Sequence, residues 1–565
     1  MMDRIRFPKD RNFLPTRPSL PDPWPRRLLH VPSMTSHEWK PGNFYGKAKE
    51  PSYNAISYTW GRFEVKNGPA IKINGVTWKI PSIDPSHFSV AEFETAIARA
   101  TDKKGYLWLD VACIDQENND VKLEEVNKQV AIFRRAAQVY AWITPWDTQS
   151  MVRTLQVLET YTTSSLGAKH GGYKLKPLTS STAPINLPSL QNALADLAAQ
   201  GWFTSLWTLQ EAWLREPWLM SRSADVISAA LIFQSRVSDI ERPVSLAWIV
   251  GDCWDVWRAL QSDRSPVARL ICGHILDSGM LSLYCRNKSV LYRAATRRKA
   301  RQPEDAVYGI MQVYDIRMPT RTDINRLFVD FGLVLNTQDL LSAQLFLHEK
   351  PVPLPGAWRM SRNIHVPLIH LLPYRSRLGG TLVDSDRPPQ FDGSAIFLSE
   401  LVSFWEVTQR QRRGAQVVPY IPHVYLDATQ SNLVCMQLND EVTQPDPAGY
   451  NRCEDNYTQR VQLAELSRHM PYSLEKYQVL YLGSIHTDLS DFMTHQKQTW
   501  ELTFHIGLLV RQEKQGGGEP WYRVGFCSWL AVSEGVMREE QTIRQKPDKI
   551  PMPPALSRKF GCRIG

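Results

Sequence analysis

A carboxylate interrupts an aromatic and apolar segment at residues 201–214, GWFTSLWTLQEAWL. On a helix, Trp207, Glu211 and Leu214 share one face, and charged side chains are rarely buried without a partner. A carboxylate in a partly desolvated pocket stabilises a nearby positive charge far better than one in water, and a neighbouring tryptophan can stack on a flat heterocycle. The segment predicts that Glu211 lies at the edge of the buried stripe and borders a pocket. In the alternative, Glu211 pairs with an arginine or caps a backbone amide.

Further polar residues lie where two predicted strands end. The stretch NAISYTWG at 54–61 alternates small or polar residues with bulky ones, which is typical of a strand. The near-continuous apolar run at 106–115 predicts a strand buried on both faces. Six residues at or near these ends are candidate ligand-binding residues: Ser57, Trp60, Gly61, Asp110, Asp115 and Gln116. In an open parallel sheet, ligands bind outside the carboxyl ends of the strands.

Some of these residues have structural alternatives. Gly61 would let a ligand approach the backbone closely, but it also suits the turn that closes the strand. Ser57 equally fits a tight contact between a strand and a helix. Asp115 could cap the helix that follows it. The spacing alone leaves both interpretations open.

The elements between these residues predict a parallel α/β sheet. A helical stripe at 88–100 separates the two strands, and a second amphipathic pattern runs from Val126 to Ala137 before a strand at 139–143. This order of strand, helix, strand, helix and strand favours right-handed crossovers. Asn74-Gly75, within 70–80, predicts a β-hairpin.

The length of 565 residues exceeds what one core usually spans. We expect a flexible arm at 1–25, an α/β domain at 26–225 with its core at 51–220, a helical region at 226–320, a loop-rich connector at 321–395 and a β-rich region at 396–565. Strand-like patterns at 477–485, 502–511 and 521–530 support the last of these.

Composition disfavours several partners. The net charge of +9 is a mild bias, and the densest basic run, at 293–301, lacks interleaved aromatic residues, so it predicts a solvated helix face and no nucleic-acid binding. The eight cysteines contain no CxxC pair, which disfavours a metal site and predicts reduced thiols in a cytoplasmic protein. No apolar stretch approaches eighteen residues, so no membrane association is expected.

Three segments in order carry a resemblance to the fungal heterokaryon incompatibility (HET) domain. They are PSYNAISYTWG at 51–61, LWLDVACIDQENN at 107–119 and WFTSLWTLQEAWL at 202–214. The resemblance implies non-self recognition between fungal strains, a form of innate immunity in which the domain triggers programmed cell death. It also implies partner proteins or self-association through this domain.

HET domains are thought to be distant relatives of TIR domains, some of which hydrolyse NAD. The relationship implies a TIR-like or flavodoxin-like parallel sheet at about 51–220, followed by a mixed helical and β-rich region. In those enzymes the catalytic glutamate follows a tryptophan by four residues on a helix, and Trp207 and Glu211 have that spacing. The resemblance therefore implies that Glu211 is catalytic and that NAD is a substrate. No bound metal is expected from the cysteine pattern, and no cofactor is predicted. Cleavage of the nicotinamide–ribose bond passes through an oxocarbenium-like ribose, which a carboxylate stabilises.

Two further functions stay open. The domain could be a non-enzymatic signalling module that assembles with partners through a tryptophan-rich surface. It could also be a homologue with neither activity, because Thr204, Ser205 and Leu206 stand where the family usually has an arginine. Whether Glu211 faces a pocket or an arginine distinguishes an enzyme from a purely structural glutamate.

Overall fold

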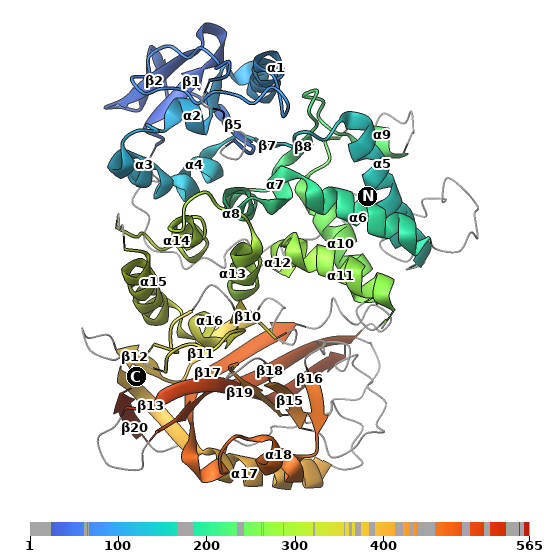
Figure 1. The fold of residues 1–565 in the computed structure, drawn as a ribbon, viewed down its shortest axis with the longest axis vertical. Helices are drawn as coiled ribbons and strands as arrows, with labels where there is room; N and C mark the ends of the chain where they lie inside the picture. The colour runs from blue at the N-terminus through green and yellow to red at the C-terminus, as the bar shows by residue number, and fades with distance from the viewer. Residues whose placement is uncertain are drawn as a thin grey trace. The chain divides into compact units, whose positions relative to one another are not determined.

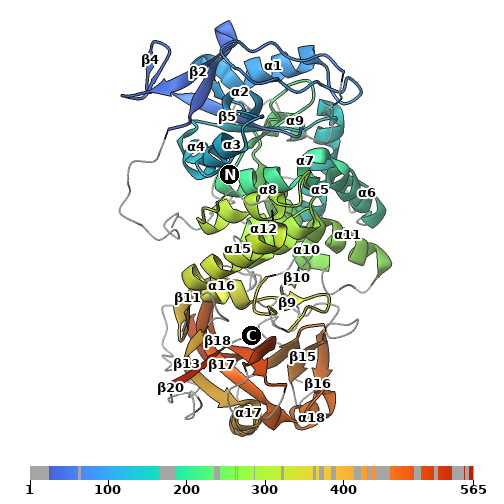
Figure 2. The same cartoon turned by 60° about the vertical axis from the view of Figure 1, so that its left-hand side comes forward.

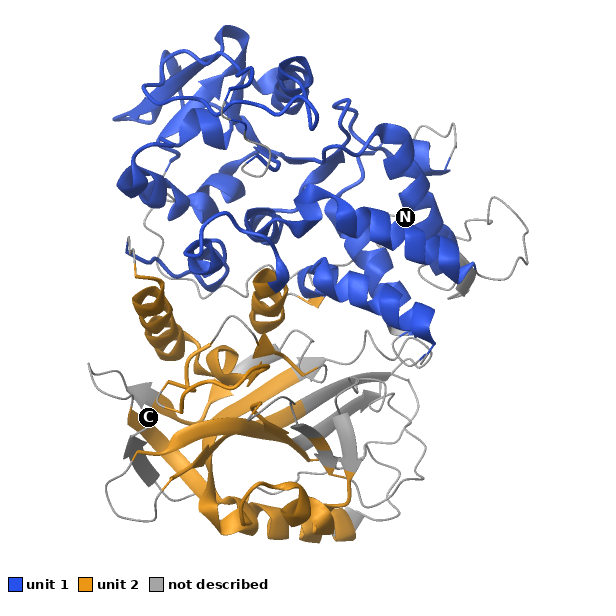
Figure 3. Cartoon of the chain, viewed as in Figure 1, with its two compact units in different colours: residues 1–284, 297–322 blue, residues 285–296, 323–565 orange. Residues whose placement is uncertain are grey.

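The computed structural model resolves the chain into two compact units (Figure 3). One comprises residues 1–284 and 297–322, and the other comprises residues 285–296 and 323–565. The residues that the structure describes are 24–60, 65, 67–165, 186–233, 242–260, 263, 265–285, 287–319, 323–354, 356–360, 364–367, 374–383, 390–412, 422–428, 434–438, 458–488, 498–513, 520–537, 553 and 559–563. The predicted arm up to residue 23, Gly61 and the glycines at 516–518 lie outside them.

The first unit contains a mixed sheet in the order β4-β3-β2-β1-β6-β5-β7-β8 (Figure 1). Its strands are β1 (Arg27–His30), β2 (Thr35–Lys40), β3 (Phe44–Tyr45), β4 (Ala48–Lys49), β5 (Tyr53–Ser57), β6 (Tyr106–Trp108), β7 (Val139–Trp142) and β8 (Trp218–Met220). The four strands from β6 to β8 in this order run parallel, whereas β1 to β4 pair antiparallel. The predicted α/β class with parallel strands is confirmed.

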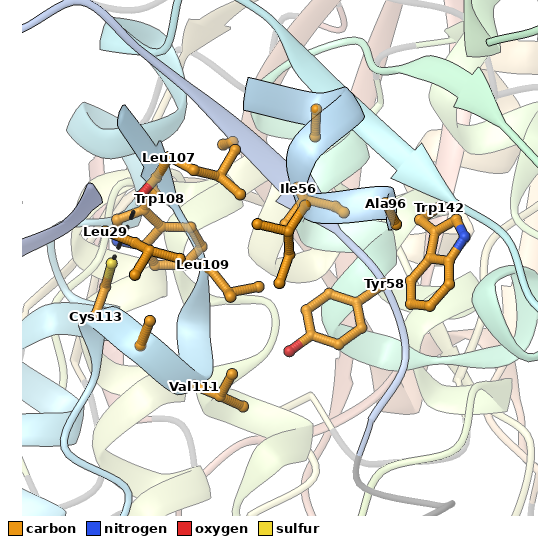
Figure 4. Close-up of a cluster of buried hydrophobic side chains, with 14 of the residues drawn as sticks. Leu29, Ile56, Tyr58, Ala96, Leu107, Trp108, Leu109, Val111, Cys113 and Trp142 are labelled. Atoms are coloured by element: carbon orange, nitrogen blue, oxygen red, sulfur yellow. Dashed lines mark hydrogen bonds between the residues drawn. The ribbon is translucent and has the colours of Figure 1, made fainter. Parts of the chain in front are cut away.

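Strand β5 lies inside the parallel group, and all five of its residues are buried. Ala55 pairs with Trp108 of β6 and with Val139 of β7. Figure 4 shows Ile56 and Tyr58, from the β5 segment, among Leu109, Ala96 and Trp142 of the hydrophobic core. Burial on both faces explains why apolar residues dominate the segment.

Helices connect the parallel strands and form the rest of the first unit. They are α1 (Val90–Thr101), α2 (Asp110–Cys113), α3 (Asn119–Val126), α4 (Gln129–Arg135), α5 (Thr148–Ser165), α6 (Leu187–Ala199), α7 (Gly201–Thr204), α8 (Leu206–Leu214), α9 (Ala229–Phe233), α10 (Leu246–Leu260), α11 (Pro266–Asp277), α12 (Met280–Cys285) and α14 (Asp305–Tyr308), with 3-10 turns η1 (Val31–Ser33), η2 (Asp102–Lys104) and η4 (Met311–Tyr314). Figures 1 and 2 both show α5, α6, α10 and α11 side by side. The predicted helix at 88–100 is α1, which begins with a capping box between Ser89 and Glu92.

Three local predictions were wrong in detail. The apolar run at 106–115 is a strand only to Trp108, because Asp110 accepts a hydrogen bond from the Val111 amide and begins α2. The segment from Val126 to Ala137 includes the end of α3 and all of α4. Asn74-Gly75 does form a turn, but its flanks do not pair as a hairpin; instead the Ser36 amide donates to the Asn74 carbonyl at 2.9 Å.

The basic run at 293–301 also differs from its prediction as a solvated face. Arg293 and Arg298 are buried, whereas Arg297 is exposed and pairs with Asp277. Arg298 donates to the carbonyl of Ser205 at 2.9 Å, beside the break between α7 and α8. The Arg298 guanidinium group therefore bonds to the backbone inside the first unit and does not face solvent. None of the described helices is long and apolar enough to cross a membrane.

The second unit is built on a ten-stranded sheet, and three of its strands begin before residue 396. Its strands are β11 (Tyr374–Leu378), β12 (Thr381–Val383), β13 (Gln390–Phe397), β14 (His423–Leu426), β15 (Val434–Leu438), β16 (Thr458–Val461), β17 (Tyr477–Asp488), β18 (Gln498–Arg511), β19 (Tyr522–Met537) and β20 (Lys559–Arg563). The remaining elements are α13 (Lys288–Arg297), α15 (Ile324–Gln338), α16 (Leu340–Gln344), β9 (Leu347–His348), β10 (Ile364–His365), α17 (Leu398–Arg412), η7 (Leu463–Glu465), α18 (Leu466–His469) and η8 (Leu474–Lys476). Gly483 occupies a bulge in β17 with φ of 138°, where an added Cβ would lie 2.1 Å from the Arg377 carbonyl.

Candidate functional site

The site forms where the last residue of β5 meets α7 and α8. Ser57 Oγ donates to Glu211 Oε2 at 2.5 Å, and the indole nitrogen of Trp202 donates to Ser57 Oγ at 2.9 Å. Trp202 and Ser57 are both buried, with 0% and 1% of their surface exposed. Two segments more than 140 residues apart in sequence are thus joined through one hydroxyl group.

Helix α8 fixes the direction in which Glu211 points. The adjacent Gln210 is fully buried, donates to Gln129 Oε1 at 2.8 Å and accepts from the Gln312 amide at 3.2 Å. Thr208 Oγ1 donates to the Trp202 carbonyl at 2.5 Å across the break after α7. Gln210 and Glu211 therefore have different roles. Gln210 joins α8 to α4 and η4, whereas Glu211 points to the end of the central strand.

The environment of Glu211 favours its protonated form. Burial raises the pKa of Glu211 to about 8, the hydrogen bond from Ser57 opposes this rise, and the negative charge of Asp110 adds to it. The side chain is nevertheless only half-buried. Among the residues that the structure describes, no lysine, arginine or histidine forms an ion pair with Glu211. Glu211 is thus a desolvated carboxyl group without a compensating cation.

Asp110 supplies a second carboxyl group directly after β6. Its Oδ1 accepts from Tyr58 Oη at 2.6 Å and from the Val111 amide at 2.7 Å. Burial raises the pKa of Asp110, and these two hydrogen bonds oppose the rise. Burial and the charge of Asp110 hold the pKa of Tyr58 well above its usual value, so the phenol remains a donor. Tyr58 therefore favours the ionised form of Asp110.

Trp60 lies three residues beyond β5, in the aromatic part of the core. Its ring makes edge contacts with Tyr58 and Phe88, at centroid distances of 6.0 and 5.8 Å. The side chain is 8% exposed, and its indole nitrogen has no hydrogen-bond partner in the part of the chain described. Gly61, its predicted neighbour in the site, is outside that part.

Asp115 and Gln116 lie in the connection between α2 and α3. Asp115 Oδ1 accepts from the amides of Glu117 and Asn118, at 3.0 and 3.1 Å, so it stabilises a turn. The cap of α3 itself is Asn118, whose side chain accepts from two amides of the first turn. Gln116 donates to the backbone carbonyl of Asp110 at 3.3 Å, which brings it beside the second carboxyl group.

Trp207 lies one turn before Glu211 on α8, but its indole is bonded elsewhere. Burial raises the pKa of Asp305, and a hydrogen bond from the Trp207 side chain opposes this rise. Trp207 is half-buried, so part of its ring remains accessible.

The predicted residues therefore divide into two groups. Ser57, Asp110 and Glu211 interact at the carboxyl end of the parallel strands, with Gln116 beside Asp110. Trp60, Asp115 and Trp207 are each engaged in separate local contacts. The connections from β5 proceed first to β6 and then across to β7, and this reversal is where open α/β sheets bind ligands.

Sequence reasoning missed Tyr58 and Trp202 as members of the site. Both lie within recognised segments, and Tyr58 is adjacent to Ser57. Their ring-borne N–H and O–H groups could have indicated them, because a buried indole or phenol usually finds a hydrogen-bond partner. Within the described ranges, no group of three or more histidine, cysteine, aspartate or glutamate side chains could hold a metal ion.

Comparison with known proteins identifies one family. Residues 53–211 match the family model described as heterokaryon incompatibility protein (HET). A search of curated proteins and a search of solved structures each found no match. The matched range begins in β5 and ends at Glu211, so it spans Ser57, Asp110 and Glu211. The chain therefore contains a HET domain, and the carboxyl-edge site lies within it.

Proposed function

We propose that the HET domain hydrolyses NAD, with Glu211 as its catalytic carboxylate. The setting of Glu211 carries this proposal: the side chain is half-buried, is hydrogen-bonded by Ser57 and forms no ion pair among the described residues. Burying an uncompensated charge is costly. A carboxyl group retained in such a setting is a candidate for chemistry, because perturbed groups concentrate at functional sites.

The reaction would break the bond between ribose C1′ and the nicotinamide nitrogen. The electron pair of that bond leaves on nicotinamide, and water forms the new C1′–O bond and loses a proton. The developing oxocarbenium charge is stabilised by an ionised carboxylate. Because the nicotinamide ring is itself cationic, its arrival favours ionisation of Glu211, whose pKa is about 8 before binding.

Other side chains near this edge have roles in the proposal. Asp110 adds a second negative charge toward the cationic part of the substrate, with Gln116 beside it. Trp207, which is half-buried, offers a ring for stacking on the nicotinamide or adenine base.

The strand order supports a TIR-like or flavodoxin-like assignment as part of this proposal. Along β6-β5-β7-β8, the parallel strands occur in the chain order second, first, third and fourth. Flavodoxin-like sheets have this order and bind their ligand where the winding direction reverses. Fold alone does not establish an activity, so the proposal depends on the carboxyl groups.

The direct test uses the purified full-length chain incubated with NAD, with released nicotinamide quantified by chromatography. Glu211→Gln removes the charge with little change in size and should lower the rate by roughly 100- to 1000-fold. Glu124→Gln is the matched control, because Glu124 is an exposed glutamate of α3 with 59% of its side chain accessible. It should retain the wild-type rate.

Expression of the same three proteins in yeast extends the test to cell death. We propose that the domain acts in fungal non-self recognition, where loss of NAD arrests growth, so wild type and Glu124→Gln should deplete NAD and reduce viability. Glu211→Gln should do neither at equal protein levels. Killing by all three proteins with NAD intact would contradict the enzymatic proposal.

That contrary result would favour self-association as the function. One observation supports this second candidate. Trp39 and Phe44, on adjacent strands β2 and β3, are 41% and 37% exposed near the β4 edge of the sheet. Exposed aromatic residues near a sheet edge are typical of protein contacts. Trp39→Ala should then abolish both killing and a concentration-dependent increase in mass measured by light scattering.

A further inference from the structure

We propose that Ser57 is a positioning residue that orients the Glu211 carboxylate, and that Trp202 in turn fixes Ser57. The inference rests on the proposed function of Glu211, and it changes the role expected of Ser57 from ligand binding to orientation. Ser57 is 1% exposed, so its hydroxyl group has little access to a ligand. Both hydrogen bonds that the structure gives to this hydroxyl are made within the protein.

The direction of the hydrogen bonds follows from the chemistry of the donors. An indole nitrogen can only donate, so Ser57 Oγ must accept from Trp202, at 2.9 Å. The hydroxyl proton is then free to point to Glu211 Oε2, at 2.5 Å. Fully buried Trp202 cannot rotate away without leaving its N–H group unsatisfied, which costs free energy. The relay therefore has one preferred direction, from Trp202 through Ser57 to Glu211.

The two carboxyl oxygens of Glu211 have different hydrogen-bond environments. Oε2 is held by Ser57, whereas Oε1 accepts no hydrogen bond from any described residue. Fixing one oxygen limits rotation of the carboxyl group and directs the other toward the substrate. Preorganised charges of this kind stabilise a transition state without reorganisation during the reaction.

The relay also opposes the two influences that favour protonation of Glu211. Burial and the charge of Asp110 raise the pKa of the carboxyl group, and the Ser57 hydrogen bond lowers it. A hydrogen bond to the ionised form stabilises that form. Removing the hydroxyl should therefore make Glu211 harder to ionise and should shift any rate that needs the carboxylate to higher pH.

A merely structural contact would predict a different result. If the bond only fastened β5 to α7 and α8, its loss would lower stability without changing the titration of Glu211. The test therefore needs a readout of protonation that does not depend on catalysis. Carbon-13 NMR of the labelled glutamate carboxyl groups supplies it, with Glu211→Gln identifying the signal that belongs to Glu211.

The experiment compares four full-length proteins: wild type, Ser57→Ala, Ser57→Thr and Trp202→Phe. We expect the Glu211 midpoint to rise by about one pH unit in Ser57→Ala, a tenfold change in proton affinity. Ser57→Thr retains the hydroxyl group and should titrate close to wild type. Trp202→Phe removes the donor that orients Ser57, together with part of the buried ring, but leaves the Ser57 hydroxyl in place, so its midpoint should rise by less. The melting temperature of each variant confirms folding.

The outcomes separate this inference from the proposed function. Equal midpoints in wild type, Ser57→Ala and Ser57→Thr would overturn the positioning role, whatever the enzymatic activity. A raised midpoint in Ser57→Ala that Ser57→Thr restores would support the relay even if NAD is not the substrate. Where NAD is hydrolysed, the rising limb of the kcat profile should move to higher pH by the same amount as the NMR midpoint.

Discussion

Glu211 in the first unit and Arg523 in the second unit are desolvated ionisable groups with opposite kinds of surroundings. In the first unit, Glu211 and Asp110 repel each other, and a hydroxyl group is the one hydrogen-bond donor recorded for Glu211. In the second unit, the Asp427 carboxylate lies 3.5 Å from the guanidinium group of Arg523. Burial raises the pKa of Glu211 and lowers the pKa of Arg523, so it disfavours the charged form of both groups. Only Arg523 has an opposite charge beside it, that of Asp427, which opposes the effect of burial.

The surroundings of Arg523 show how a buried charge is compensated in part, although Arg523 Nε and Asp427 Oδ2 have no hydrogen-bond partner in the described part of the chain. Arg523 is 0% exposed and donates to the carbonyls of Ala357 and Phe346, with its guanidinium carbon 4.0 Å from the centre of the Phe346 ring. Asp427 Oδ1 also accepts from the His348 amide at 2.9 Å. Charge, carbonyl oxygens and an aromatic face together replace the lost water.

The contrast teaches how to distinguish structural charges from functional ones. A buried charge that stabilises a fold is paired and hydrogen-bonded on several sides, as Arg523 is. A carboxyl group that is desolvated, half-accessible and next to another carboxyl group destabilises the empty site. We infer that Glu211 and Asp110 are retained for a ligand, and the variants below test that inference from the largest effect to the smallest.

The largest effect is expected for Arg523→Met. The substitution leaves Asp427 buried without its cation and removes the donor from two carbonyls. Breaking a buried pair in this way should cost about 3–5 kcal/mol, or roughly 10 °C in melting temperature by calorimetry. Adding Asp427→Asn should recover part of that loss. If the double variant were less stable than the sum of the single variants, the pair would not act as a compensated unit.

Glu211→Gln should stabilise the protein at alkaline pH, whereas Arg523→Met should destabilise it. The pKa of Glu211 is about 8 in the folded chain and has a usual value of 4.5. Between these values the folded state retains a proton that the unfolded state has lost, so stability decreases as pH rises through this window. Glutamine removes this dependence and should raise the melting temperature at pH 8.5 by roughly 3 °C.

The same variant provides its own control at lower pH. At pH 5, where Glu211 is protonated in the folded state, wild type and Glu211→Gln should melt at nearly equal temperatures. A loss of stability at both pH values would mean that Glu211 is a compensated structural charge like Arg523. The sign of the difference at pH 8.5 therefore decides between the two classes.

In the first unit, the sequence predicted several elements and candidate residues but not how those residues pair. The strand at β5, the helix α1 and the candidate residues Ser57, Asp110 and Glu211 came from periodicity and segment order, because local patterns determine which face is buried. The pairing of Ser57 with Glu211 did not, since 154 residues separate them. Only the fold shows that Trp202 occupies the other side of the same hydroxyl group.

Tertiary partners explain where the predictions were wrong. The Asn74-Gly75 turn is real, but Asn74 bonds to the backbone of Met34 and Ser36, and that long-range pairing replaces a local hairpin. Arg298 lies in a run that looks solvated, yet carbonyls of distant residues, including Ser205, accept its hydrogen bonds. Acceptors supplied by distant backbone leave no local trace in sequence.

Tyr58→Phe should have a smaller effect on the Glu211 titration. It tests the repulsion between Asp110 and Glu211. The phenol donates to Asp110 and lowers the pKa of that carboxyl group. Without it, Asp110 should be less fully ionised, so its repulsion of Glu211 decreases. The Glu211 midpoint should then move down by a few tenths of a pH unit, opposite to the shift expected for Ser57→Ala. An unchanged or higher midpoint in carbon-13 NMR would show that Asp110 does not act on Glu211.

The smallest effect on stability is expected for Glu124→Gln. This variant tests whether burial or the distance between the charges sets the strength of an ion pair. Lys128 Nζ lies 2.8 Å from Glu124 Oε1, closer than Arg523 lies to Asp427, but 59% of the Glu124 side chain is exposed. Water screens this pair, so its loss should change the free energy of unfolding by less than about 0.5 kcal/mol in urea titrations. A loss comparable to that of Arg523→Met would show that proximity, and not desolvation, sets the strength of charge pairs in this chain.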